Sequence, residues 1–276
     1  MQLSILLFES LMALLFLICL SHALKRGKQF VLELLVSVVY GVLLEILTMV
    51  QLKYYYYGDF LIKIFDAPLA IGIGWSVIIY TAMATTDKLG VAQKVRPFLV
   101  TLLALDIDLS MDAIAIREGF WTWGVNGWWF GVPLGNFFAW FIVVMSFSYF
   151  IYHFRNNRKF PGYYPAVSMI ISIVILLVLD WIWVYHLPQQ THMIILGGML
   201  FLSIGNVFQN YRQLKKDNEL DWKVFSVPFI FHVFFLTLLL VSEYRILALV
   251  LISLLMMTLG VYIHLLPSFN KIYKID

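Results

Sequence analysis

Long apolar runs, separated by short polar or basic interruptions, dominate the pattern of the chain. A membrane-spanning helix needs about 20 apolar residues. Nine runs approach this length, at residues 3–24, 30–50, 67–86, 98–118, 133–154, 166–186, 192–208, 224–241 and 246–264. The seventh run is short and the last two are separated only by residues 242–245, so eight spans is the alternative count. Because the runs are continuously apolar rather than alternating, they predict helices and not a membrane β-barrel.

The composition agrees with a chain that lies almost entirely within a membrane. Of its 276 residues, 62% are apolar and 13% are charged, whereas about a quarter of a soluble domain is charged. This excludes a cytosolic enzyme, a secreted disulfide scaffold, a nucleic-acid-binding module and a disordered protein. We therefore expect an all-α, polytopic helical bundle in the cell membrane, with residues 1–276 forming one transmembrane domain and nucleic acid excluded as a partner.

The basic residues predict how this bundle is oriented. With nine spans, 15 of the 19 Lys and Arg residues fall in the loops on one side and in the C-terminal tail. The opposite side holds only Lys53, Lys63, Arg117 and Arg245. Since basic residues concentrate on the cytoplasmic side, we expect the N-terminus outside and the C-terminus inside.

Acidic residues occur at membrane depth in the fourth run. Asp108 and Asp112 are four residues apart, which places them about 40° apart around a helix and so on one face. Asp106 points elsewhere. Charged groups inside hydrocarbon are costly and are functional candidates by default.

Other polar residues share this depth. Four acidic side chains fall four or five residues from the midpoint of their run, all toward the predicted outer side: Glu9, Glu45, Asp112 and Asp180. Asn136 lies at a similar level. We hypothesise that these groups form one polar layer around a pocket that opens toward the outer half of the bundle. The alternative is a set of separate structural hydrogen bonds between helices.

An aromatic connector, residues 119–133, follows the acidic run. It holds four tryptophans and four glycines in fifteen residues. One interpretation is an interfacial aromatic belt, and the other is an aromatic lid whose rings stabilise a cation over the acidic layer. We interpret Tyr54–Tyr57 as part of such a belt, and Trp75, beside Gly72 and Gly74, as a packing residue.

Residues 105–140 resemble the integral-membrane carotenoid biosynthesis protein family, which includes bacterioruberin-pathway hydratases. Related proteins are archaeal isoprenoid-lipid hydratases such as hydroxyarchaeol synthase. The resemblance rests on Asp108 and Asp112, on Gly119-x-Trp121-x-Trp123, and on the segment Phe130-Gly131-Val132-Pro133-x-x-Asn136-Phe137-x-x-Trp140. Upstream, Glu45, the tyrosine cluster, and Pro68 followed by Trp75 are also similar to the family. One departure is Ala113, where the family usually has proline, so the helix is expected to continue without a kink.

The resemblance implies addition of water across a trisubstituted isoprenoid C=C bond, giving a tertiary alcohol. The implied partners are a hydrophobic isoprenoid (a carotenoid end or a geranylgeranyl-type lipid chain), water and membrane lipids. Hydration of an unactivated alkene begins with protonation of carbon. Two neighbouring carboxyl groups in an apolar site can divide this work, one protonated and one ionised. Neither a metal nor an organic cofactor is required.

We therefore propose Asp112 as the proton donor, with Asp108 or Glu45 as the base that orients the attacking water. The spacing alone leaves open which of the two Asp residues is the acid. Candidates for binding the substrate or stabilising the cation are Trp75, Trp121, Trp123, Phe130, Asn136 and Trp140. The supporting candidates are Glu9, Arg117 and Asp180, with Arg117 pairing either with Glu118 or with a lipid headgroup.

Two rival functions remain open at this point. A membrane prenyltransferase is also a helical bundle with Asp-rich helices, but its Mg²⁺-diphosphate chemistry needs two such motifs, and only one is recognisable. A proton-coupled transporter also uses intramembrane carboxylates, but the chain has no recognisable inverted repeat. The six histidines include no pair at metal-binding spacing, which argues against a di-iron desaturase or hydroxylase.

Overall fold

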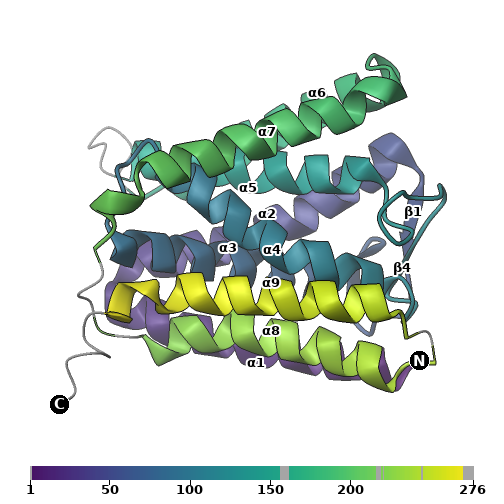
Figure 1. Ribbon diagram of the computed structural model, residues 1–276, viewed down its shortest axis with the longest axis horizontal. Helices are drawn as coiled ribbons and strands as arrows, with labels where there is room; N and C mark the ends of the chain where they lie inside the picture. Colours follow the sequence, from purple (N-terminus) through teal and green to yellow (C-terminus); the bar gives the residue numbers. More distant parts are fainter. Residues whose placement is uncertain (1, 156–161, 216–218, 220, 244, 270–276) are drawn as a thin grey trace.

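The computed structural model describes residues 2–155, 162–215, 219, 221–243 and 245–269, and it is built mainly of helices (Figure 1). The described residues form nine α-helices: α1 (Leu3–Arg26), α2 (Lys28–Leu52), α3 (Leu69–Leu89), α4 (Arg96–Ala115), α5 (Leu134–Phe154), α6 (Tyr164–Tyr185), α7 (Gln189–Gln209), α8 (Trp222–Val241) and α9 (Leu247–Leu265). Four short strands lie between them: β1 (Tyr55–Tyr57), β2 (Lys63–Ile64), β3 (Ala67–Pro68) and β4 (Trp121–Trp123). The predicted all-α bundle is confirmed, and each of the nine runs coincides with a helix.

Successive helices run antiparallel along the bundle, so that α1 begins at one end and α9 finishes at the other (Figure 1). We call the end that holds β1, β4 and residues 119–133 the aromatic end. The opposite end, which holds Arg26, Lys88, Arg96 and Arg155, is the basic end. Among the basic residues counted above on the predicted inner side, Arg158, Lys159, Lys216, Lys271 and Lys274 lie outside the described residues.

Helix α4 has an exceptional position. Of the nine described helices, all except α4 are long and apolar enough to cross a membrane by length and composition. Helix α4 instead packs against α3, α5, α7, α8 and α9, and its Asp108 and Asp112 are 0% and 2% exposed. The most polar helix is therefore surrounded by protein, where neighbouring side chains rather than lipid meet its carboxyl groups. It also runs through Ala113 without interruption, as expected for a helix without proline there.

Small residues bring α2 and α3 close together. A Cβ atom added to Gly41 would lie 2.8 Å from the Trp75 Cβ and 2.9 Å from the Gly72 backbone. Glycine permits such an approach of two helix backbones, as in many membrane-helix pairs. The close contact lies one helical turn from Glu45, and it lets the Trp75 ring reach that carboxylate.

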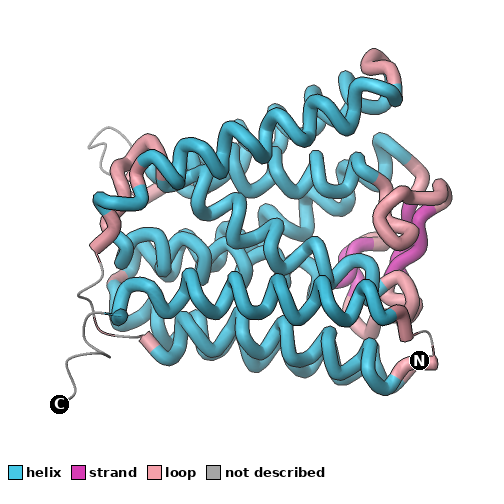
Figure 2. The backbone as a smooth tube through the Cα atoms, viewed as in Figure 1, coloured by secondary structure: helices cyan, strands magenta, loops and turns pink. Residues whose placement is uncertain are grey.

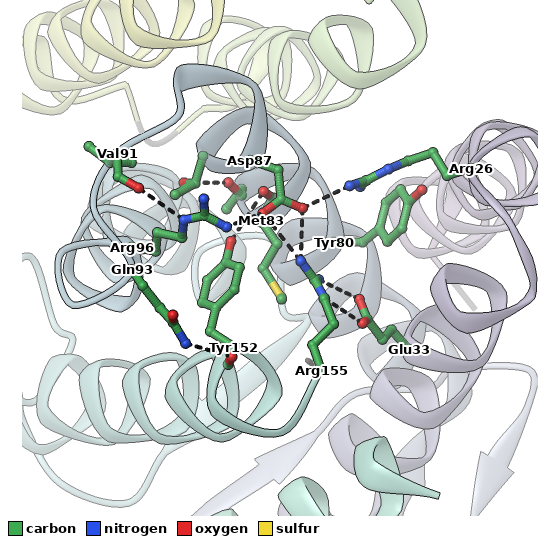
Figure 3. Close-up of polar contacts among 12 residues, drawn as sticks. Arg26, Glu33, Tyr80, Met83, Asp87, Val91, Gln93, Arg96, Tyr152 and Arg155 are labelled. Carbon is green, nitrogen blue, oxygen red and sulfur yellow. Dashed lines mark hydrogen bonds and ion pairs between the residues drawn. The ribbon is translucent and has the colours of Figure 1, made fainter. Parts of the chain in front are cut away.

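A network of partly buried charges ties the helices together at the basic end (Figure 3). The Asp87 carboxylate on α3 pairs with Arg26 at 2.7 Å, Arg155 at 3.0 Å and Arg96 at 3.3 Å. Arg155 also donates to both oxygens of Glu33, at 2.8 and 2.7 Å. Charge-assisted, bidentate bonds of this kind are directional, so the network holds the ends of α1, α2, α3, α4 and α5 in a fixed arrangement.

The strands lie together at the aromatic end (Figure 2). β1 and β4 pair antiparallel, with Tyr55 opposite Trp123 and Tyr57 opposite Trp121. Just beyond β1, the Gly58 amide donates to the Phe120 carbonyl at 2.9 Å, and a side chain at Gly58 would collide with the neighbouring loop. This short ribbon joins the loop after α2 to the loop after α4 and covers the end of the bundle.

Candidate active site

A cavity lies beneath the β1–β4 ribbon, with lining residues from α1–α6 and α8. Its volume is about 90 Å³, several times the roughly 10–15 Å³ that one buried water requires. Its acidic and amide lining groups are Glu45, Asp112, Asn136 and Asp180. Four tryptophans, Trp75, Trp121, Trp123 and Trp140, also line it. The structure thus brings together, from four helices, most of the polar groups that the sequence places at one depth.

Glu45 on α2 is held by two donors, one from α3 and one from β1. Its Oε1 accepts a 2.8 Å hydrogen bond from Trp75 Nε1, and its Oε2 accepts one of the same length from the Tyr55 hydroxyl. Tyr57 lies close enough to interact electrostatically with this carboxylate. Several donors on one carboxylate favour its ionised form. Burial disfavours the charged form of Glu45, and the donors directed at both its oxygens offset this effect and fix the carboxyl group at the cavity wall.

The tyrosines next to Glu45 keep their phenolic protons and can donate hydrogen bonds. Burial, and next the charge of Glu45, raise the pKa of Tyr55 well above its ordinary value. The same two causes raise the pKa of Tyr57. Tyr55 also shares a 2.6 Å hydrogen bond with the Thr48 hydroxyl. Both phenols thus keep their protons at physiological pH, and Tyr55 holds the Glu45 carboxylate in place.

Asp112 and Asp108 on α4 form a carboxyl pair, as their spacing predicts. Both side chains are buried on one helix face, each close to the charge of the other, so a state in which only one of the two is ionised is favoured. Asn136 Nδ2 donates to the Asp108 oxygens at 3.3 and 3.4 Å. Asp112 lines the cavity, whereas Asp108 lies behind it. The Oδ2 atom of Asp112 is buried and has no hydrogen-bond partner among the described residues.

Asp180 enters the cavity from α6. It is 3% exposed, and its Oδ2 atom has no hydrogen-bond partner in the part of the chain that the structure describes. It interacts electrostatically with Tyr54, whereas Asp112 interacts with Glu45. The cavity therefore has carboxyl groups on separate walls.

Aromatic rings enclose the space between these carboxyl groups. The ring centroids of Trp75 and Trp140 are 4.0 Å apart, with an angle of 36° between their planes. Across the β1–β4 ribbon, the Trp123 ring lies 5.1 Å from that of Tyr55 and 5.9 Å from that of Tyr54. The faces of such rings attract cations, so the rings can stabilise positive charge on carbon.

Besides Asp108, three of the sequence candidates lie outside the lining. Glu9 accepts hydrogen bonds from the backbone amides of residues 61 and 62, at 2.9 and 3.5 Å. Arg117 donates to the Ala113 carbonyl at the end of α4 and, at 2.9 Å, to the Phe130 carbonyl. Phe130 itself adopts a positive φ of 48° in that loop. Arg117 thus caps α4 and anchors the aromatic connector. Its hydrogen bonds go to backbone carbonyls rather than to Glu118 or a lipid headgroup, the partners considered from the sequence.

The tyrosine cluster corrects one sequence interpretation. Tyr56 is 62% exposed, in keeping with an aromatic belt. Tyr54, Tyr55 and Tyr57 instead line the cavity, so the belt interpretation is wrong for these three. Alternation of side chains along a strand separates Tyr56 from its neighbours, but the pairing of β1 with the distant β4 could not be inferred from local sequence. Trp75, interpreted as a packing residue, also bonds to Glu45.

Within the described residues, no group of three or more His, Cys, Asp or Glu side chains is arranged to hold a metal ion. What the geometry offers is a buried pair of carboxyl groups on α4, a carboxyl group fixed by two donors on α2, a further carboxyl with an unpartnered oxygen on α6, and aromatic walls.

Comparison with known proteins gives one match. A family model described as carotenoid biosynthesis protein matches residues 2–204. This range includes β1, β4 and the cavity-lining residues of α1 to α6. Neither the curated proteins nor the solved structures give a match.

Proposed function

The chain belongs to the carotenoid biosynthesis protein family, and from this premise we propose that it is a membrane hydratase. In this proposal it adds water across a trisubstituted C=C bond at the end of an isoprenoid chain and releases a tertiary alcohol. The substrate is a carotenoid end or a geranylgeranyl-type lipid chain, and the reaction takes place in the cell membrane without a cofactor.

The observation that carries the proposal is the setting of Asp112. Its carboxyl group is buried, neighbours a second carboxyl, and has one oxygen without a partner among the described residues, at the wall of an aromatic cavity. An apolar setting disfavours the charged form of a carboxyl group, so a proton is retained until a substrate accepts it. A positioned general acid contributes about 10²- to 10⁴-fold to the rate of such a step.

The cavity walls suit the carbocation that protonation creates. Trp75 and Trp140 present ring faces, and Glu45 supplies a fixed negative charge held by Trp75 and Tyr55. Preorganised charges of this kind stabilise a developing ion without reorganisation during the reaction. Because the space is small, it suits one branched chain end together with a water molecule. The remainder of a long isoprenoid would lie among the lipids.

The proposal is tested by expressing the chain in a host that makes both carotenoids and unsaturated isoprenoid lipids. Mass spectrometry of the lipid extract is expected to show a product heavier than one of these compounds by one water molecule. Asp112→Asn is expected to abolish it. Asp106→Asn is the matched control, because Asp106 is a carboxylate on the same helix that bonds to His232 at 3.2 Å outside the cavity.

The same extracts separate the rival functions. A metal-dependent prenyltransferase would lengthen or attach a chain rather than hydrate it, and a chelator would stop it. A proton-coupled transporter would leave lipid masses unchanged and would instead respond to a pH gradient in proteoliposomes. A product carrying one added water, formed in the presence of chelator, supports the hydratase alone.

A further inference from the structure

Asp180 is a buried carboxyl group that has no role in the proposed protonation step on α4. It lines the cavity from α6, on a different wall from Asp112. Its Oδ2 atom has no hydrogen-bond partner among the described residues, although it is fully buried. Leaving a buried carboxyl oxygen unpaired is costly. A side chain in this state, facing a cavity, indicates a ligand with a hydrogen to donate.

Trp123 provides the complementary group. Its Nε1 atom is likewise buried without a partner in the described part of the chain, and Trp123 lines the same cavity. Tyr54 connects the two, because its ring lies 5.9 Å from that of Trp123 and its hydroxyl interacts electrostatically with Asp180. The cavity lining thus offers an unpaired acceptor and an unpaired donor, each next to Tyr54. A water molecule is suited to such a pair, since it both donates and accepts hydrogen bonds.

The other carboxyl groups are less suited to hold that water. Both oxygens of Glu45 already accept hydrogen bonds, from Trp75 and from Tyr55. Asp108 lies behind the lining, with Asn136 directed at its oxygens. Asp180 is the cavity carboxyl that remains available on the wall away from Asp112.

We propose that Asp180 and Trp123 bind the water that attacks the substrate, and that Asp180 accepts its proton. The inference rests on the proposed hydratase function and assigns the base to Asp180 in place of Asp108 or Glu45. Asp112 transfers its proton to one alkene carbon, and the π electrons form the new C–H bond. The water oxygen then bonds to the resulting tertiary cation and loses one proton to Asp180. Passage of that proton back to Asp112, through water in the cavity, completes the addition of one H₂O to the alkene.

This division of roles has a consequence that can be measured in deuterium oxide. If water attack fails, the cation formed by Asp112 can only lose a proton again, and the recovered alkene then carries deuterium. Asp180→Asn is expected to lower alcohol formation by about 100-fold or more, while deuterium still enters the alkene. Asp112→Asn is expected to lose both alcohol and deuterium incorporation.

Trp123→Phe provides a second variant that keeps the aromatic ring and removes only the N–H donor. We expect it to lower the ratio of alcohol to deuterated alkene by about tenfold, the effect of one lost hydrogen bond in a buried site. Asp106→Asn serves as the control for carboxyl-to-amide exchange. Elution of each variant in detergent as a single folded species checks that the bundle is intact.

Three outcomes would overturn the inference. The first is full alcohol formation by Asp180→Asn. The second is loss of both alcohol and deuterium incorporation in Asp180→Asn, which would assign Asp180 to substrate binding or to protonation instead. The third is an unchanged ratio of alcohol to deuterated alkene in Trp123→Phe. The proposed function fails in a different way: the unmodified chain itself would then yield neither alcohol nor deuterated alkene.

Discussion

The indole nitrogen of Trp75 donates a 2.8 Å hydrogen bond to Glu45 Oε1, which joins α3 to α2 at the wall of the cavity. This contact exists because Gly41 and Gly72 allow the two helices to approach closely. The same indole ring lies 4.0 Å from that of Trp140. One side chain therefore orients the fixed anion of the site and forms part of the aromatic wall, and the two roles can be separated by substitution.

Trp75→Phe is expected to lower the hydration rate by about 10- to 100-fold, because one Glu45 oxygen loses a charge-assisted hydrogen bond while an aromatic ring remains. The rate is measured as alcohol formed per unit of folded protein in liposomes. An unchanged rate would show that the charge of Glu45 does not need this donor.

Tyr55→Phe removes the donor to the other Glu45 oxygen. Because Tyr55 also shares a hydrogen bond with Thr48, we expect a loss of the same order, about 10- to 100-fold. Tyr56→Phe is the matched control, since Tyr56 is 62% exposed and points away from the cavity. Equal rates for the two variants would contradict the assignment of Tyr55 to the site.

Helix positions followed from the sequence because each span must satisfy its backbone internally and present apolar side chains to lipid. The shared face of Asp108 and Asp112 followed from helical spacing alone. The roles of Tyr55 and Tyr57 did not, because they depend on the pairing of β1 with β4, more than sixty residues away in the chain. Residues at equal depth can also face different neighbours: Glu9 reaches a loop backbone, whereas Asp180 reaches the cavity.

Gly41→Ala tests whether close packing of α2 and α3 is needed. The added methyl group would meet the Gly72 backbone at 2.9 Å, and backbone atoms cannot move aside as a side chain can. We expect the thermal midpoint in detergent to fall and hydration to weaken, since Trp75 is displaced from Glu45. Gly197→Ala on α7, where nothing lies within 4 Å, is the control. It should be neutral or slightly stabilising, because alanine favours helices. Identical midpoints for the two variants would contradict the packing argument.

Asp87→Asn tests the charge network at the basic end. It removes the common partner of Arg26, Arg96 and Arg155, and Arg155 has only 9% of its side chain exposed. Breaking a fully buried ion pair from one side costs about 3–5 kcal/mol; since Asp87 and two of its partners are partly exposed, we expect a smaller but clear loss of thermal stability. Asp59→Asn, at an exposed loop position, should leave it unchanged. A stable Asp87→Asn protein would show that the remaining pair with Glu33 suffices.

The central claim is that Asp112 protonates carbon so that water from the medium can add to it. The most direct measurement supplies purified protein in liposomes with an isoprenoid bearing a trisubstituted end, in water labelled with heavy oxygen. We predict a tertiary alcohol that carries the label, and none from Asp112→Asn under the same conditions. An alcohol without the label, with its oxygen drawn from dioxygen, or undiminished product from Asp112→Asn, would contradict the account.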